Sequence, residues 1–191
     1  MCKNKVIVIS GVSGAGKTFL IDSLLNKMPS IKKLTTITTR PKRDDELGVK
    51  SKKFVDKETF NKMLNLKKLF VVNTVFGFEY AFDMKEFETK TKKSHLILEL
   101  KLEDIHQIKE IYEPVFSIYI RPEKPETAIK NINNRNTFYE RLEDINHELN
   151  NLENKSLPNF QLIDTVFCNR YDDSSIDDFI ITIKKVLNNV N

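Results

Sequence analysis

The most constraining stretch of the chain is "GVSGAGKT", residues 11–18, which contains three of the five glycines. It fits the pattern G-x-x-x-x-G-K-[ST], in which glycines let backbone N–H groups approach phosphate oxygens because no Cβ lies in the way. The preceding residues 5–10, "KVIVIS", are typical of a strand buried on both faces. The apolar positions from Leu20 to Met28 have helical spacing, which Pro29 ends. This order of strand, glycine loop and helix predicts a phosphate-binding loop.

The residue types of this loop indicate its ligand. Lys17 can neutralise the β- and γ-phosphates of a nucleoside triphosphate, and the Thr18 hydroxyl can ligate Mg²⁺. A glycine-rich turn without a ligand is the alternative, but it leaves Lys17 and Thr18 unexplained. We therefore expect a nucleoside triphosphate, with Mg²⁺ as cofactor, to be bound by Gly11, Ser13, Gly14, Ala15, Gly16, Lys17 and Thr18, and the resemblance described below implies that this triphosphate is ATP.

The rest of the chain predicts an α/β fold. Its 191 residues suffice for one domain with a sizeable core. Buried strands are expected at residues 95–100 and 115–120, with a helical stretch between them, and this alternation favours a parallel sheet with helices on both faces. Between the first helix and these strands, Asp56 and Asp83 are expected to cap two helices, and residues 68–82 are expected to be extended with a turn at Gly77.

The C-terminal third contains the longest helical pattern, at residues 137–155. Its apolar stripe fits either a coiled-coil seam or a helix packed on the domain, and the shortness of the pattern favours packing. A strand over residues 160–168 and a helix from about Ser174 complete the predicted elements.

Composition excludes several classes of protein. Charged residues make up 30% and hydrophobic ones 40%, as in globular proteins, and no apolar run is long enough to span a membrane or serve as a signal peptide. We therefore expect a cytoplasmic protein. Cys2 and Cys168 have no metal-ligand spacing and are expected to be reduced. The net charge of +4 is dispersed, so a small anionic ligand fits at least as well as a nucleic acid, and we expect neither nucleic-acid nor membrane partners.

Two pairs of arginines complete the set of candidate phosphate ligands. Arg40 and Arg43, in "TTITTRPKR", lie three residues apart, so two guanidinium groups could hold one phosphate or bisphosphate. The alternative for this pair is a solvated basic loop. Arg135 and Arg141 lie on or beside the long predicted helix, where they are either surface charges or cations that close over a phosphoryl group in transfer.

The order of these motifs resembles the guanylate kinase family over nearly the whole chain. "GVSGAGKT" is similar to that family's G-x-S-G-x-G-K-[ST], "TTRPKR" to its T-T-R-x-P-R with Pro41 one place early, and "NRYDD" to its V-N-D-D region. The resemblance implies catalytic roles for Lys17, Arg40, Arg135 and Arg141, and ATP contacts for Arg135 and Asn169. It implies acceptor contacts for Thr36, Arg40, Arg43, Lys52, Tyr80 and Glu99, with Lys52 in place of the family's tyrosine and Glu99 in place of an aspartate near the metal.

The resemblance also implies a P-loop NTPase fold with small acceptor-binding and lid subdomains. We expect a single domain with its core at residues 1–34, 93–125 and 156–191, an acceptor-binding insertion at 35–92 and a lid at 126–155.

Three positions depart from the family. Its base-recognising glutamate, serine or threonine, and aspartate align with Val71, Phe82 and Lys101. A valine cannot accept hydrogen bonds from guanine, and an unpaired polar edge costs about 1–3 kcal/mol. Glu79 could supply the missing carboxylate if the register of residues 71–80 shifts.

The predicted function is therefore transfer of the γ-phosphate of ATP to a nucleoside monophosphate, GMP or dGMP by resemblance. Two alternatives remain open in the sequence: transfer to another phosphorylated acceptor, such as a different nucleotide or ribose bisphosphate, and a non-catalytic binding module. The sequence does not determine the oligomeric state.

Overall fold

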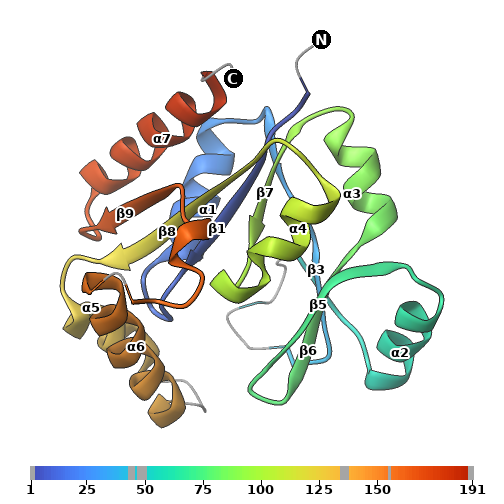
Figure 1. The fold of residues 1–191 in the computed structure, drawn as a ribbon, viewed down its shortest axis with the longest axis horizontal. Helices are drawn as coiled ribbons and strands as arrows, with labels where there is room; N and C mark the ends of the chain where they lie inside the picture. Colours follow the sequence, from blue (N-terminus) through green and yellow to red (C-terminus); the bar gives the residue numbers. More distant parts are fainter. Residues whose placement is uncertain (1–2, 43–45, 47–50, 134–137, 155, 189–191) are drawn as a thin grey trace.

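The computed structural model of the protein describes residues 3–42, 46, 51–133, 138–154 and 156–188, with only the backbone at 138–141. Its core, within these ranges, is a five-stranded parallel sheet in the order β2-β7-β1-β8-β9 (Figure 1). The strands are β1 (Val6–Gly11), β2 (Ile31–Lys33), β7 (His95–Glu99), β8 (Val115–Pro122) and β9 (Thr165–Asn169). The predicted α/β class is confirmed.

Helices cover both faces of this sheet, and strand alternation decides what each face contacts. Ile7 and Ile9 of β1 belong to an apolar cluster with residues of α1 (Lys17–Lys27) and α7 (Asp173–Asn188). Val6 and Val8 point the other way, into a cluster with α3 (Met84–Thr91) and α4 (Ile105–Ile111). All four side chains are fully buried, as expected for a central parallel strand that reads as an unbroken apolar run.

A second sheet lies beyond the carboxyl end of the core strands (Figure 1). Its order in the described residues is β4-β3-β6-β5, with β3 parallel to β4 and the other pairs antiparallel. The strands are β3 (Thr36–Thr38), β4 (Lys52–Phe54), β5 (Leu69–Val75) and β6 (Phe78–Asp83). Ile37 and Ala81 on one face pack with Phe60 of α2 (Lys57–Asn65).

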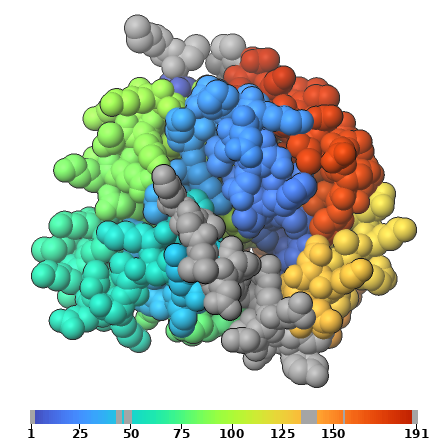
Figure 2. Space-filling view, turned by 180° about the vertical axis from the view of Figure 1, so that it is seen from behind, coloured from blue at the N-terminus to red at the C-terminus, as the bar shows by residue number. Residues whose placement is uncertain are grey.

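At the same end of the core, on the side away from the second sheet, lie α5 (Pro125–Ile132) and α6 (Phe138–Glu153) (Figure 1). From behind, α1 lies between the green segment that includes α3 and the red α7 (Figure 2). Ile145, Leu149 and Leu152 of α6 belong to the main apolar cluster, so the helix packs on the domain and the coiled-coil alternative is wrong.

The predicted caps are present. The Asp56 carboxylate accepts from the Thr59 N–H at 2.6 Å, and that of Asp83 accepts from the Glu86 N–H at 2.9 Å. The turn at Gly77 also forms, between β5 and β6.

One predicted strand is too long. Residues 160–168 were expected to be extended, but Phe160–Leu162 form a 3₁₀ turn (η3) and β9 begins at Thr165. The turn begins after Asn159, whose φ of 63° is left-handed, and alternation of apolar residues carries no signal for such a backbone reversal.

No helix in the described residues combines the length and hydropathy that crossing a membrane requires.

Candidate active site

The loop from Gly11 to Gly16 has a backbone that only glycine accommodates at its two motif positions. Gly11 has φ 133°, and a Cβ there would lie 2.0 Å from the Ile120 carbonyl oxygen on β8. Gly16, immediately before α1, has φ 82°, and a Cβ there would lie 2.4 Å from the Asn169 Nδ2 atom. Gly11 therefore passes the backbone of β8 at a distance that a side chain would prevent, and Gly16 has a left-handed backbone that side chains disfavour.

Lys17, the first residue of α1, folds back over the loop. Its ammonium donates to the carbonyl oxygens of Gly11 at 2.7 Å and Val12 at 2.9 Å. Thr18 follows on the exposed side of the first helical turn. Ser13 is partly exposed in the loop, and Ala15 is buried in the main apolar cluster. The sequence placed all these residues in one loop at a helix N-terminus, and the structure brings them together there.

The last residue of β9, the segment that follows it and α5 donate hydrogen bonds to carbonyl oxygens of this loop. Asn169 Nδ2 donates to the Ala15 carbonyl at 2.9 Å, and the Tyr171 hydroxyl donates to the Gly14 carbonyl at 2.9 Å. Asn131 of α5 donates to the same Gly14 oxygen at 3.0 Å. Burial raises the pKa of Tyr171 to about 12, so its hydroxyl remains a donor. Sequence reasoning assigned Asn169 to the adenine and missed Tyr171 and Asn131, since nothing local marks either residue.

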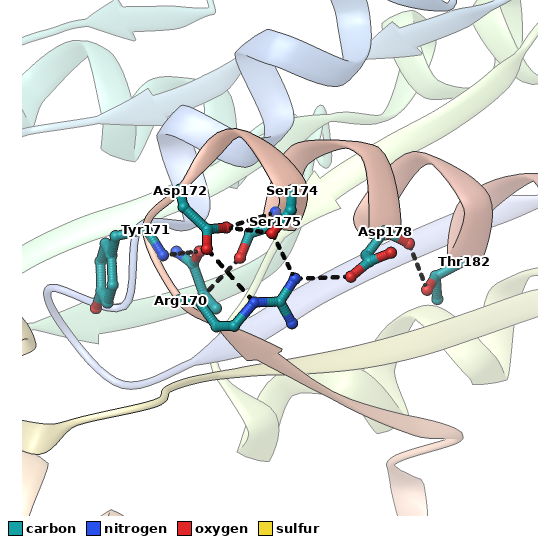
Figure 3. A network of polar contacts seen from close by, with 8 residues as sticks. Arg170, Tyr171, Asp172, Ser174, Ser175, Asp178 and Thr182 are labelled. Atoms are coloured by element: carbon teal, nitrogen blue, oxygen red, sulfur yellow. Dashed lines mark hydrogen bonds and ion pairs between the residues drawn. The ribbon is translucent and has the colours of Figure 1, made fainter.

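A capping network holds this segment in place (Figure 3). The Asp172 carboxylate accepts from the Ser174 hydroxyl and the Ser175 N–H, both at 2.8 Å, at the start of α7. The Ser174 and Ser175 hydrogen bonds lower the pKa of Asp172 to about 2. Arg170 bonds Asp178 at 2.7 Å, one turn further along the helix.

Three of the predicted acceptor residues lie on one face of the second sheet. Thr36 of β3 is the register partner of Lys52 on β4 and of Phe82 on β6, and Thr38 is the partner of Tyr80. Register partners in a sheet point to the same face. Thr36, Lys52 and Tyr80 therefore share the face opposite α2.

Arg40 joins this group through a buried ion cluster. Its Nη2 atom contacts both carboxylate oxygens of Glu46, at 2.7 and 2.8 Å, and Lys52 Nζ contacts Glu46 Oε1 at 2.6 Å. The Arg40 and Glu46 side chains are only 9% and 7% exposed. The alternative of a solvated basic loop is therefore wrong for Arg40. Sequence reasoning missed Glu46, because only the folded path of residues 40–52 brings its carboxylate to Arg40 and Lys52.

Glu79 does not take the place of the missing base-recognising carboxylate. It is the neighbour of Tyr80 on β6, so its side chain points to the opposite face. There it is hydrogen-bonded to the Thr39 hydroxyl, which lowers the pKa of Glu79, and its carboxylate lies 3.4 Å from Lys57. At the positions that depart from the family, Val71 and Phe82 are buried in an apolar cluster and Lys101 pairs with Glu103.

The remaining predicted residues are placed less completely. Glu99 ends β7 beside Ile9, just before the phosphate loop. Arg43 and Arg135 lie outside the described residues, and Arg141 is described only as backbone of α6. In the described part of the chain, no three His, Cys, Asp or Glu side chains gather as a metal site.

One further contact joins α6 to the core. The Tyr119 hydroxyl of β8 donates to Glu148 at 2.8 Å. Burial raises the pKa of Glu148, whereas its hydrogen bond to Tyr119 and the charge of Lys17 act in the opposite direction.

Comparison with known proteins agrees with this geometry. A family profile described as guanylate kinase matches residues 3–190. The chain is 30% identical over 212 residues to a guanylate kinase of Wigglesworthia glossinidia brevipalpis, covering 98% of this chain and 99% of that one. It is 29% identical to a guanylate kinase of Prochlorococcus marinus, covering 94% and 97% of the two chains. The crystal structure of guanylate kinase from Anaplasma phagocytophilum has the same fold, with a TM-score of 0.75 at 22% identity, covering 98% of this chain and 88% of that one.

Proposed function

The chain belongs to the guanylate kinase family, and from this premise we propose that it transfers the γ-phosphate of ATP to GMP or dGMP. One observation carries the proposal. The phosphate loop is intact both in its residues and in its backbone, in a chain that matches the family over residues 3–190. Non-catalytic use of the fold would not require Lys17 to be held at the centre of that loop.

On the ATP side, the loop N–H groups and Lys17 would hold the β- and γ-phosphates. Mg²⁺ typically takes one or two protein ligands and completes its shell with phosphates and water. Thr18, exposed on the first turn of α1, and Glu99, at the end of the adjacent strand, fit that requirement. The ion would neutralise charge that develops on the phosphates during transfer.

On the acceptor side, Arg40 and Lys52 would bind the acceptor phosphate, with Thr36 and Tyr80 beside them. Arg40 suits this role because a guanidinium can form two parallel hydrogen bonds to one phosphate. The phosphate would compete with Glu46, which accepts those hydrogen bonds in the structure. A phosphate oxygen is already anionic near neutral pH, so the reaction needs positioning and charge stabilisation rather than a general base.

Arg43, Arg135 and Arg141 enter the proposal through the resemblance alone. Arg43 would add a second guanidinium at the acceptor phosphate. Arg135 and Arg141 would approach the transferring phosphoryl group from the α5–α6 side, as cations that complete the site on closure.

A coupled assay of ADP release tests the proposal. The purified chain, with ATP and Mg²⁺, is offered GMP, dGMP, AMP, CMP, UMP and ribose 1,5-bisphosphate in turn. We expect turnover with GMP and dGMP and a specificity constant for GMP at least about 100-fold above that for AMP. Turnover only with a different acceptor would show that the chain phosphorylates that acceptor instead of GMP. No turnover with any of them would contradict a catalytic role.

A further inference from the structure

The contact between Asn73 of β5 and Asp104 lies on the face of the second sheet opposite α2, where the predicted residues for the acceptor nucleotide lie (the acceptor face). This contact has no role in the mechanism above. Asp104 ends the 3₁₀ turn η2 (Leu102–Asp104), which follows β7 of the core sheet. Asn73 Nδ2 donates to Asp104 Oδ2, and Gln107 donates to Asp104 Oδ1 at 3.1 Å. The contact therefore joins the second sheet to the core.

A β-bulge places Asn73 on that face. Phe70 is the register partner of Phe82, and Asn73 is the partner of Tyr80, so two residues of β5 lie opposite one residue of β6 between these pairs. In a regular ladder Val72 would oppose Tyr80 and Asn73 would point toward α2. Val71 absorbs the extra residue with φ 48°, and Val72 packs instead in the cluster beneath α2.

Two hydrogen-bond acceptors result from this arrangement. The Asp104 side chain belongs to a residue that is only 5% exposed, and burial raises its pKa. The Asn73 Oδ1 atom is buried and has no hydrogen-bond partner among the described residues. A buried acceptor left unpaired is unfavourable, so an incoming N–H donor would be stabilised there.

We propose that Asp104 and Asn73 recognise the base of the acceptor nucleotide, in place of the family's residues at Val71, Phe82 and Lys101. The inference rests on the proposed function and names its specificity residues. Guanine presents an N1–H and a 2-amino group on one edge, which require two acceptors. The corresponding edge of adenine presents an unprotonated N1, which a carboxylate repels.

The structure also shows which internal hydrogen bond a bound base would have to replace. The Asn73 amide N–H donates to the Asp104 oxygen that a guanine N–H would use. A bound base would therefore exchange this internal hydrogen bond for its own, just as the acceptor phosphate would compete with Glu46 for Arg40. At the phosphate end of the acceptor face, the acceptor phosphate would therefore replace the Glu46 carboxylate as the partner of Arg40. At the base end, a guanine N–H would replace the Asn73 amide N–H as the donor to Asp104.

The experiment measures kcat/KM of wild type and Asp104→Asn for GMP, IMP and AMP. IMP lacks the 2-amino group, so the ratio of GMP to IMP reports that contact. We expect Asp104→Asn to raise KM for GMP by about 10–100-fold and to reduce the GMP to IMP preference by about 10-fold, because hydrogen bonds to a charged group are lost. KM for ATP should change by less than about 2-fold, since the change is remote from the phosphate loop.

Two further variants make the result decisive. Asn73→Ser shortens the second acceptor without adding volume, and it should shift the same ratio in the same direction by a smaller factor. Glu103→Gln removes a neighbouring carboxylate whose side chain is 64% exposed, and it should leave the ratio unchanged. If Asp104→Asn and Asn73→Ser lower the melting temperature but keep the GMP to IMP ratio, the contact is only a structural tie and the inference is wrong. Failure of the wild type to use GMP would instead contradict the proposed function.

Discussion

The phosphate loop and the acceptor face are built in different ways. The loop is shaped by its backbone, because its glycines are left-handed and its carbonyl oxygens accept hydrogen bonds from the Lys17 ammonium. Further carbonyl oxygens of the loop accept hydrogen bonds from the side chains of Asn131, Asn169 and Tyr171. The acceptor face is shaped by side chains, in which Glu46 joins Arg40 to Lys52 and Asp104 receives Asn73.

This difference has a consequence for how each region tolerates change. A site made of backbone depends on a few glycines and accepts one kind of ligand group, here phosphate. A site made of side-chain pairs can be changed one residue at a time, which is how the same fold can keep its phosphate chemistry while its base-recognising positions differ.

The largest effect is expected from Lys17→Met, which removes the cation that lies over the carbonyl oxygens of the phosphate loop. We expect kcat to fall by about 10³-fold or more, because a fixed charge at the transferring phosphate is lost. The coupled assay with saturating ATP and GMP measures it. Lys27→Met, on the same helix with an exposed side chain, is the matched control and should retain wild-type activity. Equal rates for both variants would contradict the role of Lys17.

Arg40→Lys tests the side-chain-built site. A lysine keeps the charge but loses the fork, so KM for GMP should rise by about 10–100-fold while KM for ATP stays within about 2-fold. Lys53→Ala is a suitable control, because Lys53 is exposed and is the register partner of Ile37, on the opposite face of the sheet. A parallel rise in both KM values would mean that Arg40 acts on the whole fold rather than on the acceptor.

Glu46→Gln tests how much the ion cluster of the acceptor face adds to the stability of the fold. It leaves Arg40 and Lys52 close together without the carboxylate between them, so the free energy of unfolding should fall by about 2–4 kcal/mol. Urea unfolding measures the change. Glu58→Gln, an exposed position on α2, should stay within about 0.5 kcal/mol of wild type. An unchanged unfolding midpoint for Glu46→Gln would show that the cluster adds no stability.

The smallest effect concerns the capping network behind the phosphate loop. The pKa of Asp172 is about 2 in the folded chain, below its ordinary value of 3.8, so the folded state favours the ionised form. The contribution of the ionised Asp172 carboxylate to the stability of the folded chain is therefore fully present above pH 3.8 and is lost as the pH falls toward 2. The melting temperature of Asp172→Asn should therefore be lower than that of wild type at pH 6, and the two should converge toward pH 2. A difference that does not depend on pH would contradict this assignment.

Local patterns predicted much of this molecule. Asp56 and Asp83 cap helices because a carboxylate and an N–H three residues later are close in any helix start. The phosphate loop was predictable for the same reason, since positive φ at Gly11 and Gly16 is a property of individual residues. The bulge at Val71 was not, because a register change depends on which residues of β6 the strand meets.

The sequence by itself determined the α/β class and the position of the phosphate loop, because short-range spacing is converted by the backbone directly into strand, turn or helix. The family was indicated by a resemblance in the order of motifs along nearly the whole chain. Only the tertiary structure decided that Glu46 lies between Arg40 and Lys52, that Tyr171 supports the loop from the far end of the chain, and that Asp104 meets Asn73. The last two contacts join elements that are distant in the sequence, and the Glu46 contacts, although each spans only six residues, depend on how the chain turns between β3 and β4.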